Sequence, residues 1–415
     1  MTTSLNNNNN KELIEEWKRK KEDPSFIHTE QKRISSKILK NFVQKNKVII
    51  TLCTPPQWGK TGVSIYVAYH MCILGRIKPD NVYFITGMSD TCWVDQTKDR
   101  VLSCWKENVY HRNQIWRMTN EIDELKESNE DRNILIIIDE CHIANKKDHQ
   151  MSSLLQEVGI TNLEFIKDRN IKILQISATP SNALIDAESW NRNHKKISVG
   201  IDTNYISFKT FQKENRLFPS MNLLDKDNCL KLFEIMNSFN EPRYHFIRSV
   251  SKGPVGKSLY RQILTNLLKI CKDQNYNLIQ MNGLKTRTKI HEIYKSLSIQ
   301  PEKNTIILIK DMLGASKTID DSFIGCVHES TPNEKGYSSE VQGLPGRLCG
   351  WSKRKGKGSP IIFCEEMIID QYIKLCESGF NLHEEGFEWK DGRLKINHKG
   401  RIKSKESYLN QNESS

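Results

Sequence analysis

Two adjacent carboxylates and an imidazole follow an aliphatic run near residue 139. Residues 134–138 are all isoleucine or leucine, and they lead directly into Asp139, Glu140, Cys141 and His142. A strand that is apolar on both faces belongs in the middle of a parallel sheet, and doubly wound folds bind ligands at the carboxyl ends of such strands. Two acids at that edge suit a bound cation and a general base, whereas the simpler alternative is a strand that leads into a solvated turn.

A second cluster, upstream, has the residue types that bind phosphate. The apolar segment 48–52 runs into a loop and then into Gly59, Lys60 and Thr61, which open a stretch with helical character. Gly59 lets the backbone approach a phosphate, Lys60 can reach the β and γ oxygens, and the Thr61 hydroxyl can ligate magnesium. Asp139 would hold the same magnesium from a neighbouring strand. A Gly-Lys-Thr triplet also occurs by chance after strands, so a phosphate site is expected here only because both clusters are present.

Both clusters need parallel strands to hold them, and the sequence predicts these strands in two groups. Between residues 24 and 190, aliphatic strands alternate with amphipathic helices, which is typical of an α/β parallel sheet. These strands are expected near 48–53, 82–86, 134–139 and 172–177. A second alternation predicts a second α/β domain, with strands near 244–250, 276–280, 305–310 and 361–364.

The same patterns give the expected domain limits. We expect a polar N-terminal extension, a first domain, a connector, a second domain and a C-terminal extension, in residues 1–23, 24–200, 201–240, 241–375 and 376–415. The asparagine-rich residues 1–10 are expected to be disordered. In the C-terminal extension, Asp391 and Gly392 lie between alternating residues and predict a two-residue hairpin turn.

The composition restricts the partners and the compartment. Lys and Arg number 62 against 50 Asp and Glu, which favours a polyanionic partner. The 11 cysteines form no C-x-x-C or C-x-x-H pair, so we expect no zinc site and no disulfide framework, and a reducing compartment is the simpler interpretation. Because the sequence has neither a membrane-length apolar run nor a signal-like N-terminus, we expect a soluble intracellular protein without a membrane partner.

Two further motifs complete a recognisable order. Ser177 and Thr179 follow the fourth expected strand, and a Gly-Arg pair containing Arg347 lies in the second domain. Together with the two clusters, this order resembles the DExH branch of superfamily 2 helicases and translocases over roughly residues 24–375. The sequence of residues 342–350 is similar in style to the corresponding segment of helicases from large DNA viruses and phages. The resemblance implies two RecA-like domains in tandem and an ATP-dependent helicase or translocase that acts on DNA or RNA.

The resemblance implies roles for the residues that match its motifs. The ATP and its magnesium would be bound by residues of the phosphate loop and the helix after it, Gln57, Trp58, Gly59, Lys60 and Thr61. Asp139 would hold the magnesium, and Glu140 would orient and deprotonate the attacking water. Arg347 would be the arginine finger that stabilises charge on the transferring phosphoryl group.

Other residues match less central motifs of the family. His142, Ser177 and Thr179 resemble the residues that couple the nucleotide site to the second domain. Gln31 resembles the glutamine that reads the adenine base, although an ordinary exposed glutamine at a helix start is an equal alternative.

Two features depart from the family pattern. The phosphate loop has Pro56, Gln57 and Trp58 where the superfamily commonly has Thr-Gly-Ser, and Trp58 is interpreted either as a stacking residue or, more simply, as a packing residue. In the last motif, Gln342 lies four residues before Gly346, and Gly350 occupies the position of a second arginine. No second arginine finger can therefore be assigned.

Nucleic acid would be held mainly through its phosphates, because a motor that moves along a strand cannot depend on base identity. Three loops at strand ends resemble the motifs that make such contacts, and their candidate residues are Gly87, Arg248 and Lys310. For each loop a solvated surface role is an equal alternative. The basic run 353–357 is interpreted as a solvated loop that would raise affinity at low salt.

The leading hypothesis is an enzyme, a nucleic-acid-stimulated ATPase that translocates on or unwinds a duplex. The alternative is a weakly active or inactive scaffold with a helicase-like fold that binds nucleic acid or a protein partner. The departures at the phosphate loop and at Gly350 favour the scaffold, whereas the joint presence of Lys60, Asp139, Glu140 and Arg347 favours the enzyme. A nuclease would need a further catalytic domain on a separate chain.

Overall fold

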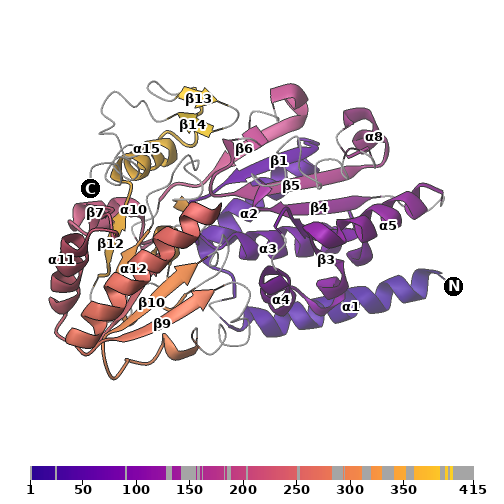
Figure 1. Cartoon of the computed structure of the whole chain (residues 1–415). Helices are drawn as coiled ribbons and strands as arrows, with labels where there is room; N and C mark the ends of the chain where they lie inside the picture. Colours follow the sequence, from indigo (N-terminus) through magenta and orange to yellow (C-terminus); the bar gives the residue numbers. More distant parts are fainter. Residues whose placement is uncertain are drawn as a thin grey trace. The chain divides into compact units, whose positions relative to one another are not determined.

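The computed structural model divides the chain into two compact units, Met1–Gly200 and Ile201–Ser415. The residues expected to connect two domains, 201–240, lie in the second unit (Figure 1). The structure describes residues 2–23, 26–88, 91–127, 133–141, 156, 159–160, 162–181, 183–184, 188–201, 204–249, 253–282, 293, 295–310, 319–329, 341–351, 359–383, 388–390 and 393–395.

The first unit is built on a six-stranded sheet in which each described pairing is parallel, with the strand order β3-β2-β4-β5-β1-β6. In chain order the strands are β1 Ile49–Cys53, β2 Val82–Thr86, β3 Val109–His111, β4 Ile134–Asp139, β5 Ile171–Ser177 and β6 His194–Ser198.

The four central strands confirm the sequence prediction, and the two edge strands were missed. Strands β1, β2 and the aliphatic part of β4 are buried along their length, as aliphatic runs covered on both faces must be. The edge strand β3 has only three residues, too few for a periodic signal. The other edge strand, β6, contains His194, Lys195 and Lys196. Such charged edges discourage pairing with other chains, but they also lack the apolar pattern from which a strand is predicted.

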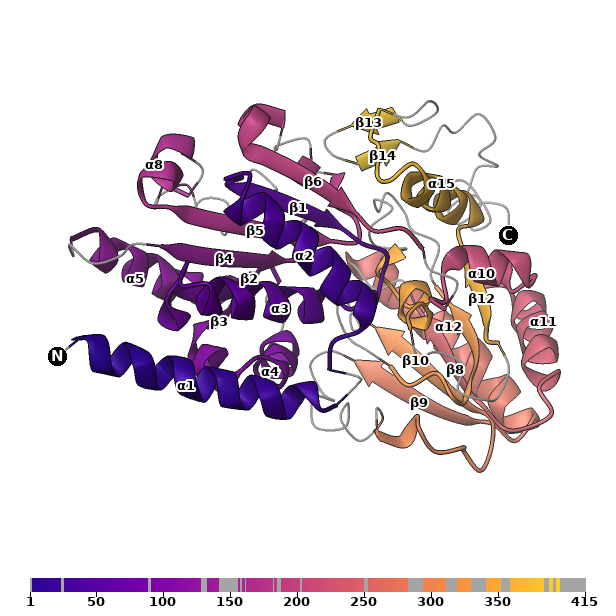
Figure 2. The ribbon, with the colours of Figure 1, turned by 180° about the vertical axis from the view of Figure 1, so that it is seen from behind.

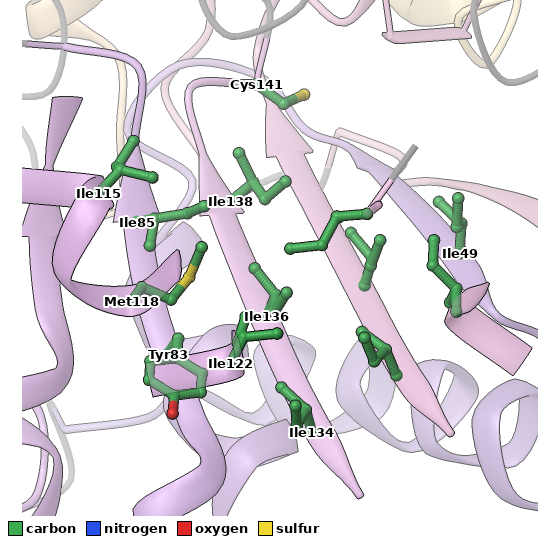
Figure 3. Close-up of a cluster of buried hydrophobic side chains, with 14 of the residues drawn as sticks. Ile49, Tyr83, Ile85, Ile115, Met118, Ile122, Ile134, Ile136, Ile138 and Cys141 are labelled. Atoms are coloured by element: carbon green, nitrogen blue, oxygen red, sulfur yellow. The ribbon is translucent and has the colours of Figure 1, made fainter. Parts of the chain in front are cut away.

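Helices cover both faces of this sheet. They are α1 Thr2–Lys21, α2 Thr29–Val43, α3 Lys60–Ile73, α4 Thr91–Arg100, α5 Ile115–Glu127 and α8 Leu163–Asp168. On one face, Met118 and Ile122 of α5 pack against Ile136 and Ile138 of β4 in a buried cluster (Figure 3). On the other face lie α2 and α3, which pack on each other (Figure 2). The site-bearing helix α3 is therefore fixed between the sheet and α2.

The expectation of disorder in residues 1–10 was wrong, because helix α1 begins at Thr2. Its C-terminal half anchors it to the first unit. The indole of Trp17 is stacked on the ring of Tyr69 in α3, with the ring centroids 3.9 Å apart. The Lys20 ammonium donates a hydrogen bond of 2.8 Å to the carbonyl of Val101, after α4.

The second unit repeats the architecture with another six-stranded sheet whose described pairings are parallel, with the strand order β7-β12-β11-β8-β10-β9. Its strands are β7 Leu217–Pro219, β8 Tyr244–Arg248, β9 Asn277–Asn282, β10 Thr305–Lys310, β11 Ile324–His328 and β12 Ile361–Cys364. The residues of strand β7 were expected in a connector, but β7 pairs with β12 and forms one edge of the sheet. Strand β11 was missed because Gly325 interrupts its short apolar run.

The helices of the second unit are α10 Phe208–Lys213, α11 Lys226–Asn237, α12 Gly253–Asp273 and α15 Glu366–Glu377. Helices α11 and α12 pack together on the sheet through a buried cluster that includes Phe233, Leu267 and Leu308. The predicted C-terminal hairpin pairing is confirmed, because β13 Glu388–Lys390 and β14 Arg393–Lys395 pair antiparallel with Lys390 opposite Arg393. The expected turn residues Asp391 and Gly392 lie outside the described residues. Across the described residues, no helix has both the length and the apolar composition that a bilayer crossing requires.

Candidate active site

The carboxyl ends of three neighbouring strands in the first unit bring the predicted residues to one edge of the sheet. In the parallel register, Cys53 at the end of β1 lies beside Ser177 at the end of β5, and Asp139 at the end of β4 lies beside Ile176. The loops that follow these strands start together, so residues separated by more than a hundred positions meet there. This is the edge at which the sequence analysis expected a ligand site.

A lysine and two acids are in direct contact at this edge. The Lys60 ammonium, at the start of α3, forms an ion pair with the Glu140 carboxylate and lies 3.6 Å from Asp139 Oδ1. The side chains of Lys60 and Glu140 are only 12 % and 2 % exposed. Burial lowers the pKa of Lys60, but the attraction of Glu140 and Asp139 outweighs it, so the pKa is raised above its ordinary value. The lysine is therefore held in its charged form.

Glu140 has an unusual backbone conformation. Its φ is +53°, in the left-handed region that residues other than glycine rarely occupy, and its amide donates a hydrogen bond of 3.0 Å to Asp139 Oδ1. Such a conformation costs about 1–3 kcal/mol and is found most often at functional sites. It turns the chain sharply after β4 and places both carboxylates against Lys60.

Asp139 has a second partner that the sequence analysis did not identify. The indole Nε1 of Trp93, in α4, donates a hydrogen bond of 3.0 Å to Asp139 Oδ2. Burial raises the pKa of Asp139, Lys60 lowers it, Glu140 raises it, and the bond from Trp93 lowers it, with a net rise. No sequence signal marks Trp93, because its role depends on how α4 is placed beside the end of β4.

The phosphate loop, residues 54–61, is shaped by left-handed backbone. Gly59 has φ +98° and precedes α3, and Gln57 has φ +56°. At this φ any residue with a Cβ would strain the backbone, and a Cβ on Gly59 would also lie 1.9 Å from Gln31 Nε2 and displace that amide, so glycine is favoured here. Trp58 is 1 % exposed, as expected for the packing alternative, and it lies inside the first unit rather than on its surface.

Gln31 holds this loop from the neighbouring helix α2. Its Nε2 donates a hydrogen bond of 2.7 Å to the Gly59 carbonyl, and its Oε1 accepts one of 2.7 Å from the His28 amide. The side chain is 4 % exposed, so the alternative of an ordinary exposed glutamine was wrong. Gln31 therefore links the start of α2 to the residue that precedes α3.

The hydroxyl residues after β5 lie at the same edge. The amide of Thr179 donates a hydrogen bond of 3.0 Å to Ser177 Oγ, and the Thr54 amide donates one of 3.1 Å to the Ser177 carbonyl. Ser177 and Thr179 are both buried. The structure thus places Ser177 directly against the first residue of the phosphate loop. His142 lies outside the described residues.

The three candidates for nucleic-acid contact have different surroundings. Gly87 directly follows β2 and is buried. In the second unit, Arg248 and Lys310 end the neighbouring strands β8 and β10, but each already has a partner there. Arg248 Nε forms an ion pair of 2.6 Å with Glu329 Oε1, and the Lys310 ammonium lies 4.9 Å from the centre of the Tyr260 ring.

Arg347 belongs to a short 3₁₀ helix, Pro345–Leu348, and is 1 % exposed. The segment before it is held by Glu329, whose Oε2 accepts a hydrogen bond of 3.0 Å from the Leu344 amide. Glu329 therefore connects Arg248 to the segment that carries Arg347. The sequence analysis missed Glu329 because it follows β11, a strand that was itself missed. The basic run 353–357 lies outside the described residues.

Comparisons with known proteins show the fold and distant relatives. No protein-family model matches this sequence. The chain is similar to the uncharacterized protein L594 of Acanthamoeba polyphaga mimivirus, with 24 % identity over 351 residues that cover 80 % of this chain and 84 % of that protein.

Among solved structures, the chain is similar to the ATP-dependent Type ISP restriction-modification enzyme LlaBIII bound to DNA, with a TM-score of 0.53 and 12 % identity. The match covers 81 % of this chain and 27 % of that enzyme. A Dbp5 variant from S. cerevisiae, bound to Gle1 and IP6, matches 86 % of this chain and 92 % of that chain with a TM-score of 0.42 and 12 % identity. The predicted fold class, two RecA-like parallel-sheet units in tandem, is confirmed.

Proposed function

We propose that this chain is a nucleic-acid-dependent ATPase of the DExH branch of superfamily 2, working as a helicase or translocase. One observation carries the proposal. Lys60 is the first residue of α3, contacts Glu140 and lies 3.6 Å from Asp139 at the carboxyl edge of a parallel sheet. This arrangement supplies a cation for phosphates, an acid for a metal ion and an acid for water. The fold shared with LlaBIII, an ATP-dependent enzyme whose structure is bound to DNA, supports the same assignment.

In this proposal the residues of the first unit bind ATP and activate water. Lys60 binds the β and γ phosphates, and its raised pKa keeps it charged at neutral pH. Glu140 accepts the proton of the attacking water once phosphate oxygens compete for Lys60. The backbone amides at the start of α3 would donate to phosphates bound there, and the absence of a Cβ at Gly59 leaves room for Gln31 to fix the loop.

The donor set at this edge fits a magnesium ion. The Thr61 hydroxyl and the Asp139 carboxylate are hard oxygen ligands, which Mg²⁺ prefers, and the bond from Trp93 orients Asp139. When bound, the ion would neutralise charge on the β and γ phosphates.

The adenine and coupling roles extend outward from this centre. We assign Gln31 to the adenine side of the loop, supported by its bond to Gly59, with Gln57 and Trp58 shaping the loop. Ser177 and Thr179, with His142, are assigned to coupling, because Ser177 contacts the first residue of the phosphate loop. Arg347 is assigned as the finger that enters from the second unit.

Nucleic acid, DNA or RNA, is assigned to the loops after β2, β8 and β10, through Gly87, Arg248 and Lys310. The excess of 62 basic over 50 acidic residues supports a polyanionic partner. Because Arg248 is paired with Glu329, it would contribute to phosphate binding only as part of that pair.

The test is ATP turnover by the full chain with and without single-stranded DNA and single-stranded RNA. We expect turnover to rise at least tenfold with one of the two polymers, because strand binding would bring Arg347 to the γ phosphate. Equal rates with and without both polymers would refute the coupling. ATP binding with only background turnover in every condition would support the scaffold alternative instead.

A further inference from the structure

The first unit contains a cavity at the edge of its sheet opposite to the candidate active site. The cavity has a volume of about 360 Å³. It is lined by residues at the starts of three strands, where Val48 precedes β1, Lys172 is the second residue of β5, and Asn193 precedes β6. Because these strands are parallel, their starts share the amino edge of the sheet, whereas Asp139 and Ser177 lie at the carboxyl edge. The cavity is therefore separate from the site proposed for ATP.

The lining of this cavity carries positive charge without a matching acid. Lys167, Lys172 and Arg192 contribute three cations, and none of the nine lining residues is acidic. Lys172 is 7 % exposed, and its ammonium donates a hydrogen bond of 2.9 Å to Asn46 Oδ1. Within the described part of the chain, no carboxylate oxygen lies within 4.0 Å of this ammonium. A largely buried cation whose partner is a neutral amide is costly, and a bound anion would remove that cost.

Neighbouring charges extend the positive field around the cavity. Burial, together with Lys195, Lys47 and Lys196, lowers the pKa of His194 to about 4 at the start of β6. Burial also lowers the pKa of Lys172. The Lys47 ammonium contacts the carbonyl of Arg192, so the chain that supplies Arg192 to the cavity is tied to the residue before Val48. Lys47 therefore lies beside the cavity, and its charge adds to those of Lys167, Lys172 and Arg192, which favours an anion.

The size and the chemistry of the cavity indicate the class of ligand. A volume near 360 Å³ lies in the range of small-molecule sites, roughly 300–1,000 Å³. Lysine and arginine donors bind phosphate oxygens through charge-assisted hydrogen bonds, and a phosphate group offers enough oxygens for several cations at once. We propose that this cavity binds a small ligand through a terminal phosphate or diphosphate group, with Lys172 as the central contact and Lys167 and Arg192 as outer contacts.

Calorimetric titration with inorganic pyrophosphate tests this site. The full chain would carry Lys60→Ala in every sample, so that the phosphate loop contributes little to the measured binding. We expect one binding event whose affinity falls at least tenfold in Lys172→Met and in Arg192→Gln. Arg192 is exposed, so its replacement leaves the fold intact even if Lys172→Met weakens it.

The matched control is Lys37→Gln, which removes the same charge from an exposed position on α2 outside the cavity. The affinity of the Lys37→Gln variant for pyrophosphate should stay within twofold of the affinity of the Lys60→Ala parent. The proposal is overturned if no pyrophosphate binds to the parent, or if Lys172→Met and Arg192→Gln lose no more affinity than Lys37→Gln. Because the phosphate loop is disabled in all samples, these outcomes are independent of the ATPase proposal.

Competition with two oligonucleotides of the same sequence, one with a 5′ phosphate and one with a 5′ hydroxyl, identifies the source of the phosphate group. Displacement of pyrophosphate only by a 5′-phosphorylated strand would assign the cavity to a nucleic-acid end, and displacement by neither strand would assign it to a free phosphorylated molecule. Equal displacement by the 5′-phosphorylated and 5′-hydroxyl strands would overturn the proposal, because backbone phosphodiesters would then account for binding.

Discussion

At the scale of single residues, the candidate active site is one lysine held between two carboxylates. Lys60 is surrounded by Glu140 and Asp139, and Asp139 is also bonded to Trp93. The two acids and the lysine could be predicted from sequence, because each ends or begins an element with a strong pattern. Trp93 could not, because tryptophans in helices are usually core residues and only the packing of α4 reveals its hydrogen bond.

Replacing Trp93 by phenylalanine should shift the pH dependence of ATP turnover. The bond from the indole stabilises the charged form of Asp139, so its loss should raise the pKa of Asp139 further above its ordinary value. In the proposed function the ionised carboxylate holds magnesium. As the solution is acidified, ATP turnover by Trp93→Phe should therefore fall at a higher pH than turnover by the unmodified chain. The measurement is kcat against pH. The control is Trp116→Phe, at a 50 % exposed position in α5. If kcat falls over the same acidic pH range in Trp93→Phe and in Trp116→Phe, this role for Trp93 is ruled out.

A second residue-scale prediction concerns stability at low pH. Burial lowers the pKa of His245, in β8, to about 4, and its Nδ1 accepts a hydrogen bond of 3.1 Å from the Cys326 amide. The folded pKa lies below the unfolded value near 6.5, so the unfolded state binds more protons and stability is lost as pH falls from about 6.5 toward 4. Between pH 7 and pH 5 the loss from this histidine should be about 2 kcal/mol.

Hydrogen exchange of β8 and β11 at pH 7 and pH 5 measures this loss, after correction for the intrinsic exchange rates. His245→Gln should flatten the pH dependence, whereas His383→Gln, at an exposed position, should leave it unchanged. An undiminished dependence in His245→Gln would show that other groups cause it. His328 adds a similar effect, because burial also lowers its pKa to about 4.

At the scale of elements, the central strands could be predicted and the edges could not. Strands β1, β2, β4 and β5 are mostly apolar because both faces are covered, and that requirement is visible in the sequence. Strand β7, with the sequence Leu217–Pro219, is stabilised mainly by pairing with β12, so its local sequence carries almost no signal. Glu329 directly follows β11. Because that strand was not predicted, Glu329 was not identified as a residue at a strand end.

Glu329 joins three elements of the second unit, so its charge should matter for both stability and turnover. Glu329→Gln would remove the ion pair with Arg248 and weaken the bond to the Leu344 amide. We expect a loss of about 2–3 kcal/mol in the unfolding free energy of the second unit. If Arg347 acts on the γ phosphate, kcat should fall about tenfold while the ATP dissociation constant stays within twofold.

Urea unfolding and steady-state kinetics provide these two readouts. The control is Glu377→Gln, which breaks the ion pair of Glu377 with Lys209, where both side chains are nearly half exposed, and should cost less than about 1 kcal/mol. Equal stability losses in the two variants would contradict the positioning role of Glu329.

At the scale of the whole molecule, the proposed function divides the site residues between two units of similar architecture. The first unit contains the lysine and the acid pair, and the second contains Arg347. Repetition of the strand-helix period predicted both units from sequence. It could not show that residues 201–240 belong to the second sheet, because β7 pairs with β12, a strand more than 140 positions later.

The most direct test of the central claim is ATP turnover by Glu140→Gln in the presence of a stimulating nucleic acid, together with ATP binding by the same variant. Glutamine keeps the shape of Glu140 but cannot accept the proton of the attacking water. The account predicts ATP affinity within threefold of the unmodified chain and turnover lower by roughly 10²–10⁴-fold. Turnover within threefold of the unmodified chain would contradict the proposal that this edge of the sheet hydrolyses ATP.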